Sequence, residues 1–259
     1  MSTEIARPLW RSTGGYRHVT GFRERPWLGR SDAAELMDGD GFTAAELTAN
    51  FRDIRRVNRW FGGISAILGA LPELVPAGAT TFSLLDIATG VADIPLAIQQ
   101  WCAARGLAVE ITATDIEPKM LALASAQIAG TSGIHLRQAD ARAMPFASHS
   151  FDVVTCSLAL HHCDPADAVQ VLREMDRICR RGFIVNDLRR SALAYGATWL
   201  ASRLTTRNRL TRHDGPLSIQ RAYTPTELRA LLDEAGVADA EVRISPWFRM
   251  VAVKRANLD

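Results

Sequence analysis

From residue 80 onward, short apolar runs alternate with stretches in which apolar residues recur every three or four positions. The first pattern predicts strands and the second predicts helices. The expected strands lie at residues 82–87, 108–114, 133–138, 151–157, 182–187 and 240–253, the last divided at Pro246. The expected helices lie at residues 91–105, 117–128, 165–179 and 224–235. This alternation predicts an α/β fold with a mainly parallel, seven-stranded sheet covered by helices on both faces.

The chain before residue 80 has a helical pattern instead. Apolar side chains recur at helical spacing in residues 50–61, arginines occupy the other faces, and a glycine pair ends or bends the helix. Ser31 and Thr43 are expected N-caps, and Glu46 completes a capping box with Thr43.

These patterns divide the chain into two parts. We expect an N-terminal arm and helical cap at residues 1–78 and a main domain at residues 79–259. Residues 188–222 interrupt the alternation after the fifth strand and are expected to be an insertion on the substrate side. They follow the carboxyl end of a strand, which is the edge of an open α/β sheet where ligands bind.

The stretch "LLDIATGVADIPLAIQ", residues 84–99, has the form of a nucleotide-binding loop between a strand and a helix. A dinucleotide loop requires three glycines, whereas this one has Ala88, Gly90 and Asp93 at the corresponding spacings. A carboxylate at Asp93 would repel a diphosphate, which argues against NAD or FAD. It favours S-adenosylmethionine, whose sulfonium and ammonium groups are cationic.

Other acidic residues follow the expected strands. Asp86 is placed to orient the turn and the amino-acid end of this cofactor, and Gly90 permits close approach of the backbone. Asp115, after the second strand, can accept from both ribose hydroxyls. Asp140, after the third strand, can accept from the adenine amino group, while Ala141 leaves room for the ring.

Three segments, "LLDIATGVADIP", "DIEPKML" and "ADARAMPFASHSFDVV", occur in the order found in class I S-adenosylmethionine-dependent methyltransferases. The chain resembles this family, and within it the quinone and menaquinone C-methyltransferase branch. The resemblance implies a Rossmann-like fold, S-adenosylmethionine as cofactor and S-adenosylhomocysteine as product. The cofactor-binding residues that it implies are Asp86, Ala88, Thr89, Gly90, Asp93, Asp115, Ile116, Met120, Asp140, Ala141, Ser157 and Leu158.

The chain departs from the quinone branch at two points. Ala88 replaces the first glycine of the loop, and "LALHHC" stands where the quinone enzymes usually carry an Arg-Asn pair. The second difference favours the broader group of small-molecule methyltransferases, including O-methyltransferases.

His161 and His162 follow the fourth strand, beside the expected methyl group. One of them is a candidate general base for a phenolic hydroxyl, because the ordinary pKa of histidine suits that task. Alternatively, both shape the loop through hydrogen bonds to the backbone. Asp187 is expected to bind substrate or to cap the following helix.

We expect no metal. The adjacent residues His161, His162, Cys163 and Asp164 cannot easily converge on one ion, and no second cluster completes the set. A second alternative is a magnesium ion at Asn186-Asp187, but the order of these residues differs from the Asp-Asn order of magnesium-dependent methyltransferases.

Several aromatic residues are candidates for substrate contact. The apolar side of the 50–61 helix, with Trp60 and Phe61, is expected to cover the cofactor mouth, and its arginines either contact a polyanion or form a solvated face. Tyr195 and Trp199 either line an aromatic substrate pocket or pack in the core.

The bulk composition narrows the setting. The net charge is +2 over 259 residues, which argues against nucleic acid as a partner. No apolar run reaches the ~18 residues of a membrane span, and the N-terminus lacks the order of a signal peptide. The four cysteines show no CxxC spacing, so we expect reduced thiols in a cytoplasmic protein. The N-terminal arm would suit a homodimer.

The sequence therefore predicts an enzyme that methylates a small, aromatic, phenolic or polyketide-like acceptor in secondary metabolism, with O-methylation favoured by the histidines. C-methylation of a quinol or phenol ring is the alternative within the same class. A regulatory scaffold that binds S-adenosylmethionine without catalysis is the alternative from another class.

Overall fold

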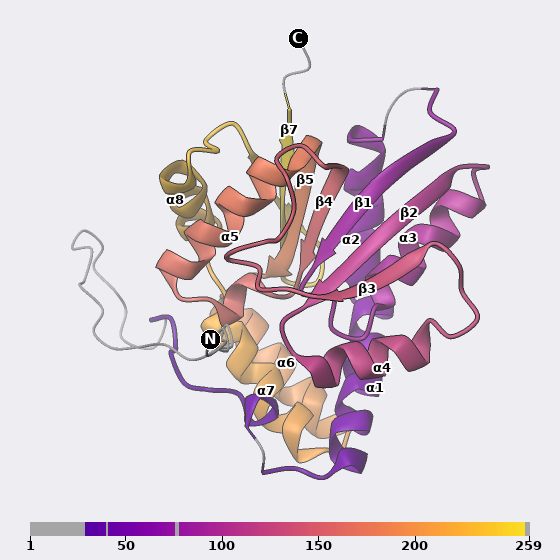
Figure 1. Ribbon diagram of the computed structural model, residues 1–259. Helices are drawn as coiled ribbons and strands as arrows, with labels where there is room; N and C mark the ends of the chain where they lie inside the picture. Colours follow the sequence, from indigo (N-terminus) through magenta and orange to yellow (C-terminus); the bar gives the residue numbers. More distant parts are fainter. Residues whose placement is uncertain (1–28, 40, 76–77, 257–259) are drawn as a thin grey trace, which may run out of the picture.

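The computed structural model describes residues 29–39, 41–75 and 78–256. Seven strands form one sheet in the order β3-β2-β1-β4-β5-β7-β6 (Figure 1). Their bounds are β1 Thr81–Ile87, β2 Ala108–Asp115, β3 Ile134–Gln138, β4 Phe151–Ser157, β5 Cys179–Leu188, β6 Glu241–Ser245 and β7 Arg249–Arg255. The first five strands pair in parallel, and β7 lies antiparallel to both β5 and β6. The predicted α/β fold is confirmed, and the last strand is divided around Pro246 as expected.

Eight α-helices accompany the sheet in the described residues. They are α1 Ala44–Trp60, α2 Gly63–Ala70, α3 Asp93–Ala103, α4 Pro118–Gln127, α5 Pro165–Ile178, α6 Ala192–Thr205, α7 Arg209–Arg221 and α8 Pro225–Ala235. Three short 3₁₀ turns are η1 Leu36–Asp38, η2 Leu71–Glu73 and η3 Leu160–His162. None of the described helices is both long and apolar enough to cross a membrane.

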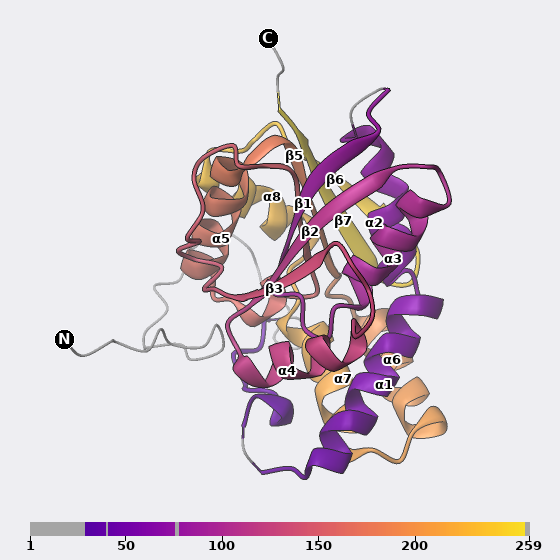
Figure 2. The ribbon, with the colours of Figure 1, turned by 45° about the vertical axis from the view of Figure 1, so that its right-hand side comes forward.

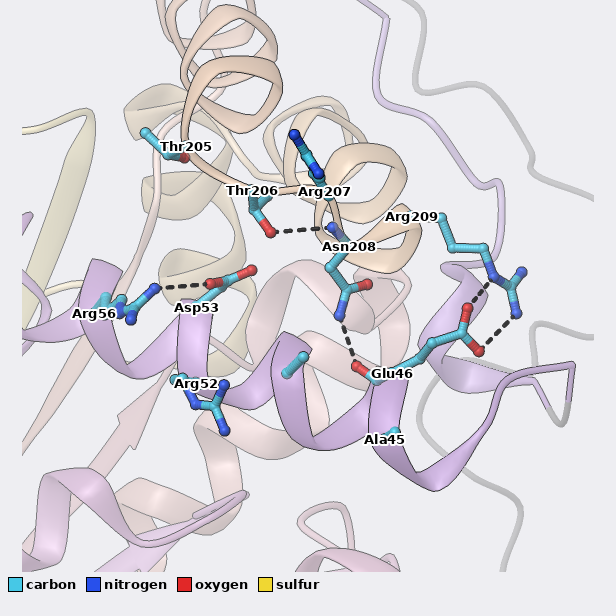
Figure 3. Close-up of a pocket in the computed structure, with 11 residues that line it drawn as sticks. Ala45, Glu46, Arg52, Asp53, Arg56, Thr205, Thr206, Arg207, Asn208 and Arg209 are labelled. Atoms are coloured by element: carbon cyan, nitrogen blue, oxygen red, sulfur yellow. Dashed lines mark hydrogen bonds and ion pairs between the residues drawn. The ribbon is translucent and has the colours of Figure 1, made fainter.

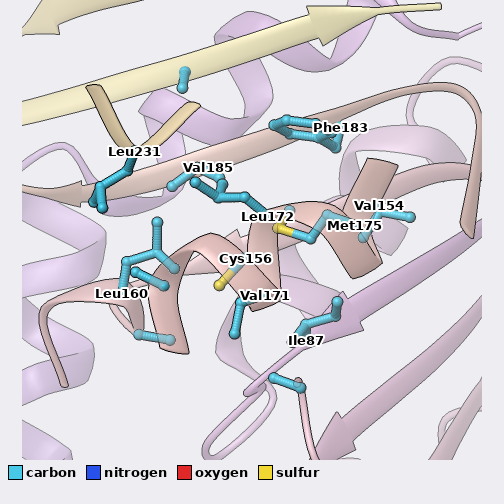
Figure 4. Packing of buried hydrophobic residues seen from close by; sticks show 14 of the residues in the cluster. Ile87, Val154, Cys156, Leu160, Val171, Leu172, Met175, Phe183, Val185 and Leu231 are labelled. Carbon is cyan, nitrogen blue, oxygen red and sulfur yellow. The ribbon is translucent and has the colours of Figure 1, made fainter. Parts of the chain in front are cut away.

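Hydrophobic layers pack on both faces of the sheet because neighbouring residues of a strand point to opposite sides. Leu85 and Val154 belong to the layer beneath α5 and α8, whereas Leu84 and Val153 belong to the layer beneath α2 and α3. Figure 4 shows the first layer, with Val154 and neighbouring side chains meeting those of α5. These two layers hold the carboxyl ends of β1, β2, β4 and β5 in fixed relation.

Helices α1, α6 and α7 lie together beyond the carboxyl ends of the parallel strands (Figures 1 and 2). The predicted capping box of α1 is confirmed, because the Thr43 hydroxyl accepts from the backbone N–H of Glu46 and the Glu46 carboxylate accepts from that of Thr43. The insertion after β5 forms an α6–α7 hairpin, so two segments far apart in sequence cover one edge of the sheet.

The prediction that Ser31 begins a helix is wrong. Its backbone N–H donates to the carbonyl of Gln220 on α7, 3.1 Å away. The Asp214 carboxylate, also on α7, accepts from the backbone N–H groups of Leu36 and Met37 at 2.8 and 3.1 Å. These contacts use backbone groups that a longer helix would need for itself, so η1 is only one short turn.

Candidate active site

Two carboxylates lie at the carboxyl ends of neighbouring central strands. Asp86 of β1 is 2% exposed, and its Oδ1 accepts a 2.6 Å hydrogen bond from the Thr155 hydroxyl of β4. Burial raises the pKa of Asp86 to about 7. Asp115 ends β2, and burial raises its pKa to about 6. Both groups therefore titrate close to neutral pH, and a bound cation would favour their ionised forms.

The loop after β1 has an unusual backbone conformation. Ala88, Gly90 and Ala92 all have positive φ angles, of 53°, 57° and 61°. Non-glycine residues in this region carry a conformational cost, which persists where the surrounding structure determines the turn. Here the Thr89 N–H donates to the Thr114 carbonyl at 2.8 Å. The loop thus turns back onto the end of β2.

Asp115 itself holds this loop in place. Its Oδ2 accepts from the backbone N–H of Gly90 and its Oδ1 from that of Glu117, both at 2.9 Å. A third predicted residue, Ile116, is half-buried, and its carbonyl accepts from the Gln138 side chain at 3.0 Å. The structure therefore brings the expected ribose-binding carboxylate together with the glycine of the loop.

Asp93 has a partner that the sequence did not reveal. Its Oδ2 accepts a 2.8 Å hydrogen bond from the Asn58 amide of α1. The buried guanidinium of Arg249 donates in turn to Asn58 Oδ1 at 3.2 Å and to the Phe61 carbonyl at 2.7 Å. A polar chain therefore joins α1 to the first residue of α3 and to β7.

Helix α1 covers the loop after β1 through Phe51, which the sequence did not single out. Phe51 is 8% exposed and packs in a small cluster with Val91 of the loop and Met120 of α4. Trp60 is 68% exposed and lies outside this cluster, so its expected place over the cofactor mouth stays a prediction. The Phe61 ring lies edge-on to Trp247, 5.2 Å away, rather than over the loop. Both residues come at the end of α1, beyond the turn that faces Val91.

The residues after β3 form an ion-pair network. Asp140, the expected adenine partner, accepts from the Arg142 guanidinium through both carboxylate oxygens, with the shortest contact at 2.7 Å. Arg142 also reaches Asp167 of α5 at 3.1 Å. Ala141 is buried beside them. A cofactor amino group at Asp140 would therefore share this carboxylate with Arg142, a residue that no sequence pattern singled out.

The chain turns sharply after β4. The Ser157 hydroxyl accepts from the Asn186 amide at 2.8 Å, and Leu158 has a positive φ of 56°. The backbone N–H of Leu158 donates to the Asn186 carbonyl at 2.8 Å. This turn places η3, with both histidines, beside the end of β5.

His161 and Asp187 meet at this edge. The Nδ1 atom of His161 lies 2.7 Å from Oδ1 of Asp187, and both side chains are buried. Asp187 Oδ2 accepts from the backbone N–H of His161 at 3.0 Å. A carboxylate only accepts, so Nδ1 carries the proton of the neutral imidazole and Nε2 has the lone pair.

Asp187 does not act in the two other ways that the sequence left open. It does not cap the following helix, because the Ser191 hydroxyl accepts from Ala194 at the start of α6. It also does not share a magnesium site with Asn186. Adjacent side chains of a strand point to opposite faces, and Asn186 is bonded to Ser157 while Asp187 is bonded to His161.

Two acidic residues of the N-terminal segment cover the histidines. Oε1 of Glu35 lies 4.0 Å from Nε2 of His161, and Oδ2 of Asp38 lies 4.0 Å from Nδ1 of His162. The two imidazole rings have centroids 4.2 Å apart. No local signal in the sequence marks Glu35 or Asp38, because only the path of the segment along α7 brings them to the histidines.

Opposing effects set the pKa values in this cluster. Burial would lower the pKa of His161, but the charges of Asp187 and Glu35 and the hydrogen bond to Asp187 raise it overall. Burial raises the pKa of Asp187, yet His161 lowers it below its ordinary value. Burial and the neighbouring His161 lower the pKa of His162 to about 3. Burial raises the pKa values of Glu35 and Asp38.

Backbone contacts hold the histidine turn. The Arg221 guanidinium donates to the carbonyls of His161 and His162 at 3.3 and 3.0 Å, and Arg30 also donates to His161 at 3.1 Å. The Tyr223 hydroxyl donates to the Cys163 carbonyl at 2.9 Å. The carbonyl groups of this turn are therefore occupied, and only the imidazole rings are directed at the acidic residues.

The outer surface of α6 carries the other two aromatic candidates. Tyr195 is 37% exposed and Trp199 is 44% exposed. The alternative prediction, that these residues pack in the core, is therefore wrong. The Arg203 guanidinium lies over the Trp199 ring, 4.3 Å from its centroid. Their proposed role in lining a substrate pocket stays a prediction.

An open groove of about 610 Å³ lies between α1 and the α6–α7 turn (Figure 3). Arginines and acidic residues line it, including Arg52, Arg56 and the ion pair between Glu46 and Arg209 at 2.6 Å. It contains none of the predicted cofactor or catalytic residues. The expected site residues therefore lie outside this groove.

Comparisons with known proteins agree with this geometry. Residues 84–182 match a family model described as a methyltransferase domain. Over these residues the chain is similar to methyltransferase domains of the class I, S-adenosylmethionine-dependent type, and it resembles the menaquinone methyltransferase branch. The matched residues include the loop, both central carboxylates and the two histidines.

The sequence relatives cover only part of the chain. A demethylmenaquinone methyltransferase from Deinococcus radiodurans is 37% identical over 101 residues, or 38% of this chain and 39% of the relative. The enzyme of the same name from Staphylococcus haemolyticus is 32% identical over 101 residues, or 39% of this chain and 40% of the relative. The chain thus spans less than half the length of these curated relatives in the alignment.

Solved structures share the fold. A putative S-adenosyl-L-methionine-dependent methyltransferase from Methanococcus maripaludis superposes with a TM-score of 0.56 at 16% identity, covering 85% of this chain and 98% of its own. The structure titled "PigF with SAH" superposes with a TM-score of 0.54 at 16% identity, covering 78% of this chain and 57% of its own. The methyltransferase fold therefore extends well beyond residues 84–182.

The side chains of the methyltransferase domain fit its cofactor. Asp86 and Asp115 are buried carboxylates with raised pKa values, and a cationic ligand would stabilise their charge. The loop offers a backbone turn at Gly90 without the glycine pattern of a diphosphate site. The donor and acceptor set thus suits a nucleoside that carries positive charge.

Proposed function

We propose that this protein methylates a hydroxyl group of a small aromatic or polyketide-like acceptor, with S-adenosylmethionine as methyl donor. The observation that supports the oxygen acceptor is the contact of 2.7 Å between His161 and Asp187, directly beyond β4. A hydroxyl needs a partner that fixes it and accepts its hydrogen bond, whereas an activated ring carbon does not.

In this proposal the strand ends hold the cofactor. Asp115 accepts from the ribose hydroxyls, Asp86 faces the amino-acid end, and Asp140 accepts from the adenine amino group. When bound, S-adenosylmethionine supplies an electrophilic methyl group. The protein contributes alignment, because in-line transfer depends on the approach of the acceptor to that methyl group.

The histidine turn orients the acceptor. Asp187 fixes the His161 ring through two contacts, and the side chain of His162 is 20% exposed. We place the acceptor hydroxyl at the His162 side, where the cluster is open. Helix α6, which follows β5 directly, is placed to contact the rest of the acceptor through Tyr195 and Trp199.

C-methylation of a quinol or phenol ring is the second candidate. The names of the relatives, which are demethylmenaquinone methyltransferases, favour it. The histidine pair in place of the Arg-Asn pair of that branch favours the oxygen acceptor.

The test is turnover with a panel of phenols, quinols and aromatic polyketides, scored by release of S-adenosylhomocysteine. The position of a ¹³C-methyl group in the product, read by NMR, separates the two candidates: an O-methyl signal supports the proposal and a C-methyl signal overturns it. Binding of the cofactor without turnover of any acceptor would favour the non-catalytic scaffold.

A second arm tests the histidine. His161→Ala is expected to lower turnover at least tenfold, or about 1.4 kcal/mol of barrier, while calorimetry shows unchanged affinity for S-adenosylmethionine. His135→Ala is the control, because that side chain is 69% exposed on β3. Equal rates for the two variants would contradict the role of His161.

A further inference from the structure

Three side chains from two distant segments converge at the histidine turn. Glu35 comes from the N-terminal segment, and His161 and His162 come from η3. One possible ligand atom of each lies within 4.8 Å of those of the other two. We propose that these residues, with Asp38, bind one divalent transition-metal ion.

The spacing is close to that of an occupied site. Nitrogen and oxygen ligands lie about 2.1 Å from a zinc ion, so two of them are at most about 4.2 Å apart. His161 Nε2 and Glu35 Oε1 are 4.0 Å apart, as are His162 Nδ1 and Asp38 Oδ2. In a tetrahedral site neighbouring ligands lie about 3.4 Å apart, so the two 4.0 Å pairs must close by about 0.6 Å and a pair near 4.8 Å by about 1.4 Å.

The tautomer of His161 suits a metal ligand. Asp187 accepts a hydrogen bond from Nδ1–H of His161, so the lone pair of the neutral imidazole is on Nε2, the atom 4.0 Å from Oε1 of Glu35. A histidine that ligates a metal usually donates its other ring N–H to a carboxylate, which fixes the ring and raises its basicity. Asp187 would therefore orient the His161 ligand and would not bind the ion itself.

Asp38 gives an independent observation. Its side chain is 7% exposed, and its Oδ2 has no hydrogen-bond partner among the described residues. Leaving a buried carboxylate oxygen without a partner costs free energy. Nδ1 of His162 lies 4.0 Å from this oxygen, beyond hydrogen-bond distance. An ion between Asp38 and His162 supplies the missing partner and uses the imidazole lone pair.

The acidic residues are held in place before any ion arrives. The Ser218 hydroxyl of α7 donates to Glu35 Oε1 at 2.6 Å. The Asp214 carboxylate binds the backbone of η1, and the Arg221 guanidinium donates to the Ala33 carbonyl at 2.6 Å. Arg221 also brings positive charge near the cluster, but its contacts with three backbone carbonyls leave the carboxylates directed at the imidazoles.

The donor set indicates the class of ion. Two imidazoles with one or two carboxylates suit zinc, manganese or ferrous iron, whereas magnesium and calcium prefer sites made of oxygen ligands alone. The sequence alone predicts no metal, because neighbouring residues of one loop do not complete a site. Glu35 and Asp38 supply the missing second group of ligands, which comes from a distant part of the chain.

The ion would also explain how the acceptor hydroxyl is activated. This consequence, unlike the site itself, rests on the proposed function. An acceptor hydroxyl that binds a divalent ion has a lowered pKa, because the ion stabilises the oxyanion. Its proton then leaves to solvent water, and His161 acts as a ligand instead of a base. The ion would also fix the acceptor oxygen beside His162, where the cluster is open.

Metal content tests the site without any acceptor. The full-length protein is treated with chelator, dialysed and titrated with Zn²⁺, Mn²⁺ or Co²⁺ by calorimetry, with bound metal counted by mass spectrometry. We expect one equivalent of ion, and a visible absorption band of coordinated Co²⁺. No binding of any of the three ions at 100-fold molar excess overturns the proposal.

Variants identify the ligands. Glu35→Gln keeps the shape of the side chain and is expected to weaken ion binding at least tenfold, as is His162→Ala. His135→Ala and Glu110→Gln are controls, since these side chains are each 69% exposed and pair with each other on β2 and β3. Circular dichroism checks that each variant folds. Ion binding by Glu35→Gln and His162→Ala equal to that of the controls overturns the assignment.

The outcome is separable from that of the proposed function. Full methyl transfer by chelator-treated protein with no detectable metal would overturn the ion and leave O-methylation standing. One bound ion in a protein that methylates no hydroxyl would support the site and overturn the acceptor.

Discussion

Asp187 contacts His161 at two points. One carboxylate oxygen lies 2.7 Å from the ring Nδ1, and the other accepts from the backbone N–H of His161 at 3.0 Å. The same carboxylate accepts from the backbone N–H of Leu188 at 2.7 Å. The end of β5 thereby sets both the position of the histidine turn and the rotation of the imidazole ring. The orientation of the His161 ring in η3 thus depends on a residue of β5.

Asp187→Asn tests this dependence. The amide has the same shape but carries no charge, so the ring is held less firmly and its tautomer is no longer fixed. We expect turnover to fall at least tenfold while the affinity for S-adenosylmethionine changes less than twofold, measured by product release and calorimetry. The exposed-site variant Glu110→Gln is the control. An equal loss of cofactor affinity would assign Asp187 to the cofactor site instead.

Affinity for S-adenosylmethionine should rise with pH. The pKa of Asp86 is raised to about 7 and that of Asp115 to about 6, and the ionised carboxylates attract the cationic cofactor and accept its hydrogen bonds. Calorimetry at pH 5.5, 6.5 and 8 is expected to show tightening across this range, with release of protons on binding. A flat profile would contradict the placement of the cofactor against these groups.

The same raised pKa values should make the protein without cofactor less stable as the pH rises, whereas they make cofactor binding tighter. Folded Asp86 and Asp115 bind protons more tightly than they do in the unfolded chain, where the pKa of Asp is about 3.9. Their contribution to stability is therefore present below about pH 4 and is lost as the pH rises through 6 and 7. Asp86→Asn removes the Asp86 part of this change, and melting temperatures of variant and wild type between pH 5 and 8 measure it.

Asp115→Asn should weaken cofactor binding at least tenfold. The carboxylate accepts from the Gly90 backbone, so its loss affects both the ribose contact and the loop. Glu110→Gln, at the other end of the same strand, is the matched control because its side chain is 69% exposed. Unchanged affinity in both variants would rule out the ribose assignment.

Truncation to alanine should lower the free energy of unfolding much more at Phe51 than at Trp60, although both residues belong to α1. Phe51→Ala removes a buried ring from the cluster with Val91 and Met120, and such losses cost about 3–5 kcal/mol. Trp60→Ala removes a side chain that is 68% exposed, and surface changes usually stay within about 0.5 kcal/mol. Urea unfolding of the two variants measures both. Equal costs would contradict the described packing of α1.

The elements of the main domain could be predicted because each is periodic over its own length. The second strand was expected at 108–114 and lies at Ala108–Asp115, and the helix expected at 165–179 lies at Pro165–Ile178. Similarly, the carboxylates at strand ends follow from the edge at which parallel strands present their ligands. Asp86 and Asp115 were found in this way.

Contacts between distant segments could not be predicted. The sequence indicates a helical start at Ser31, but α7 binds the backbone there. Asn58 and Arg249 are separated by 191 positions, and no local pattern links them to Asp93. Likewise, Glu35 reaches His161 only because Asp214 and Arg221 fix the path of its segment. Side chains that meet only because distant segments pack together cannot be recognised from the sequence around them.

The segment with Glu35 and Asp38 and the α6–α7 hairpin both lie outside residues 84–182, the part shared with the family model. They contact each other through α7 and meet the shared part at the histidine turn. The histidine turn itself belongs to the shared part, so exchange of the two outer segments as a matched pair would change what surrounds the histidines and leave the strand ends intact. An engineer who seeks a new acceptor should replace both together, because either one alone loses the partner that shapes it.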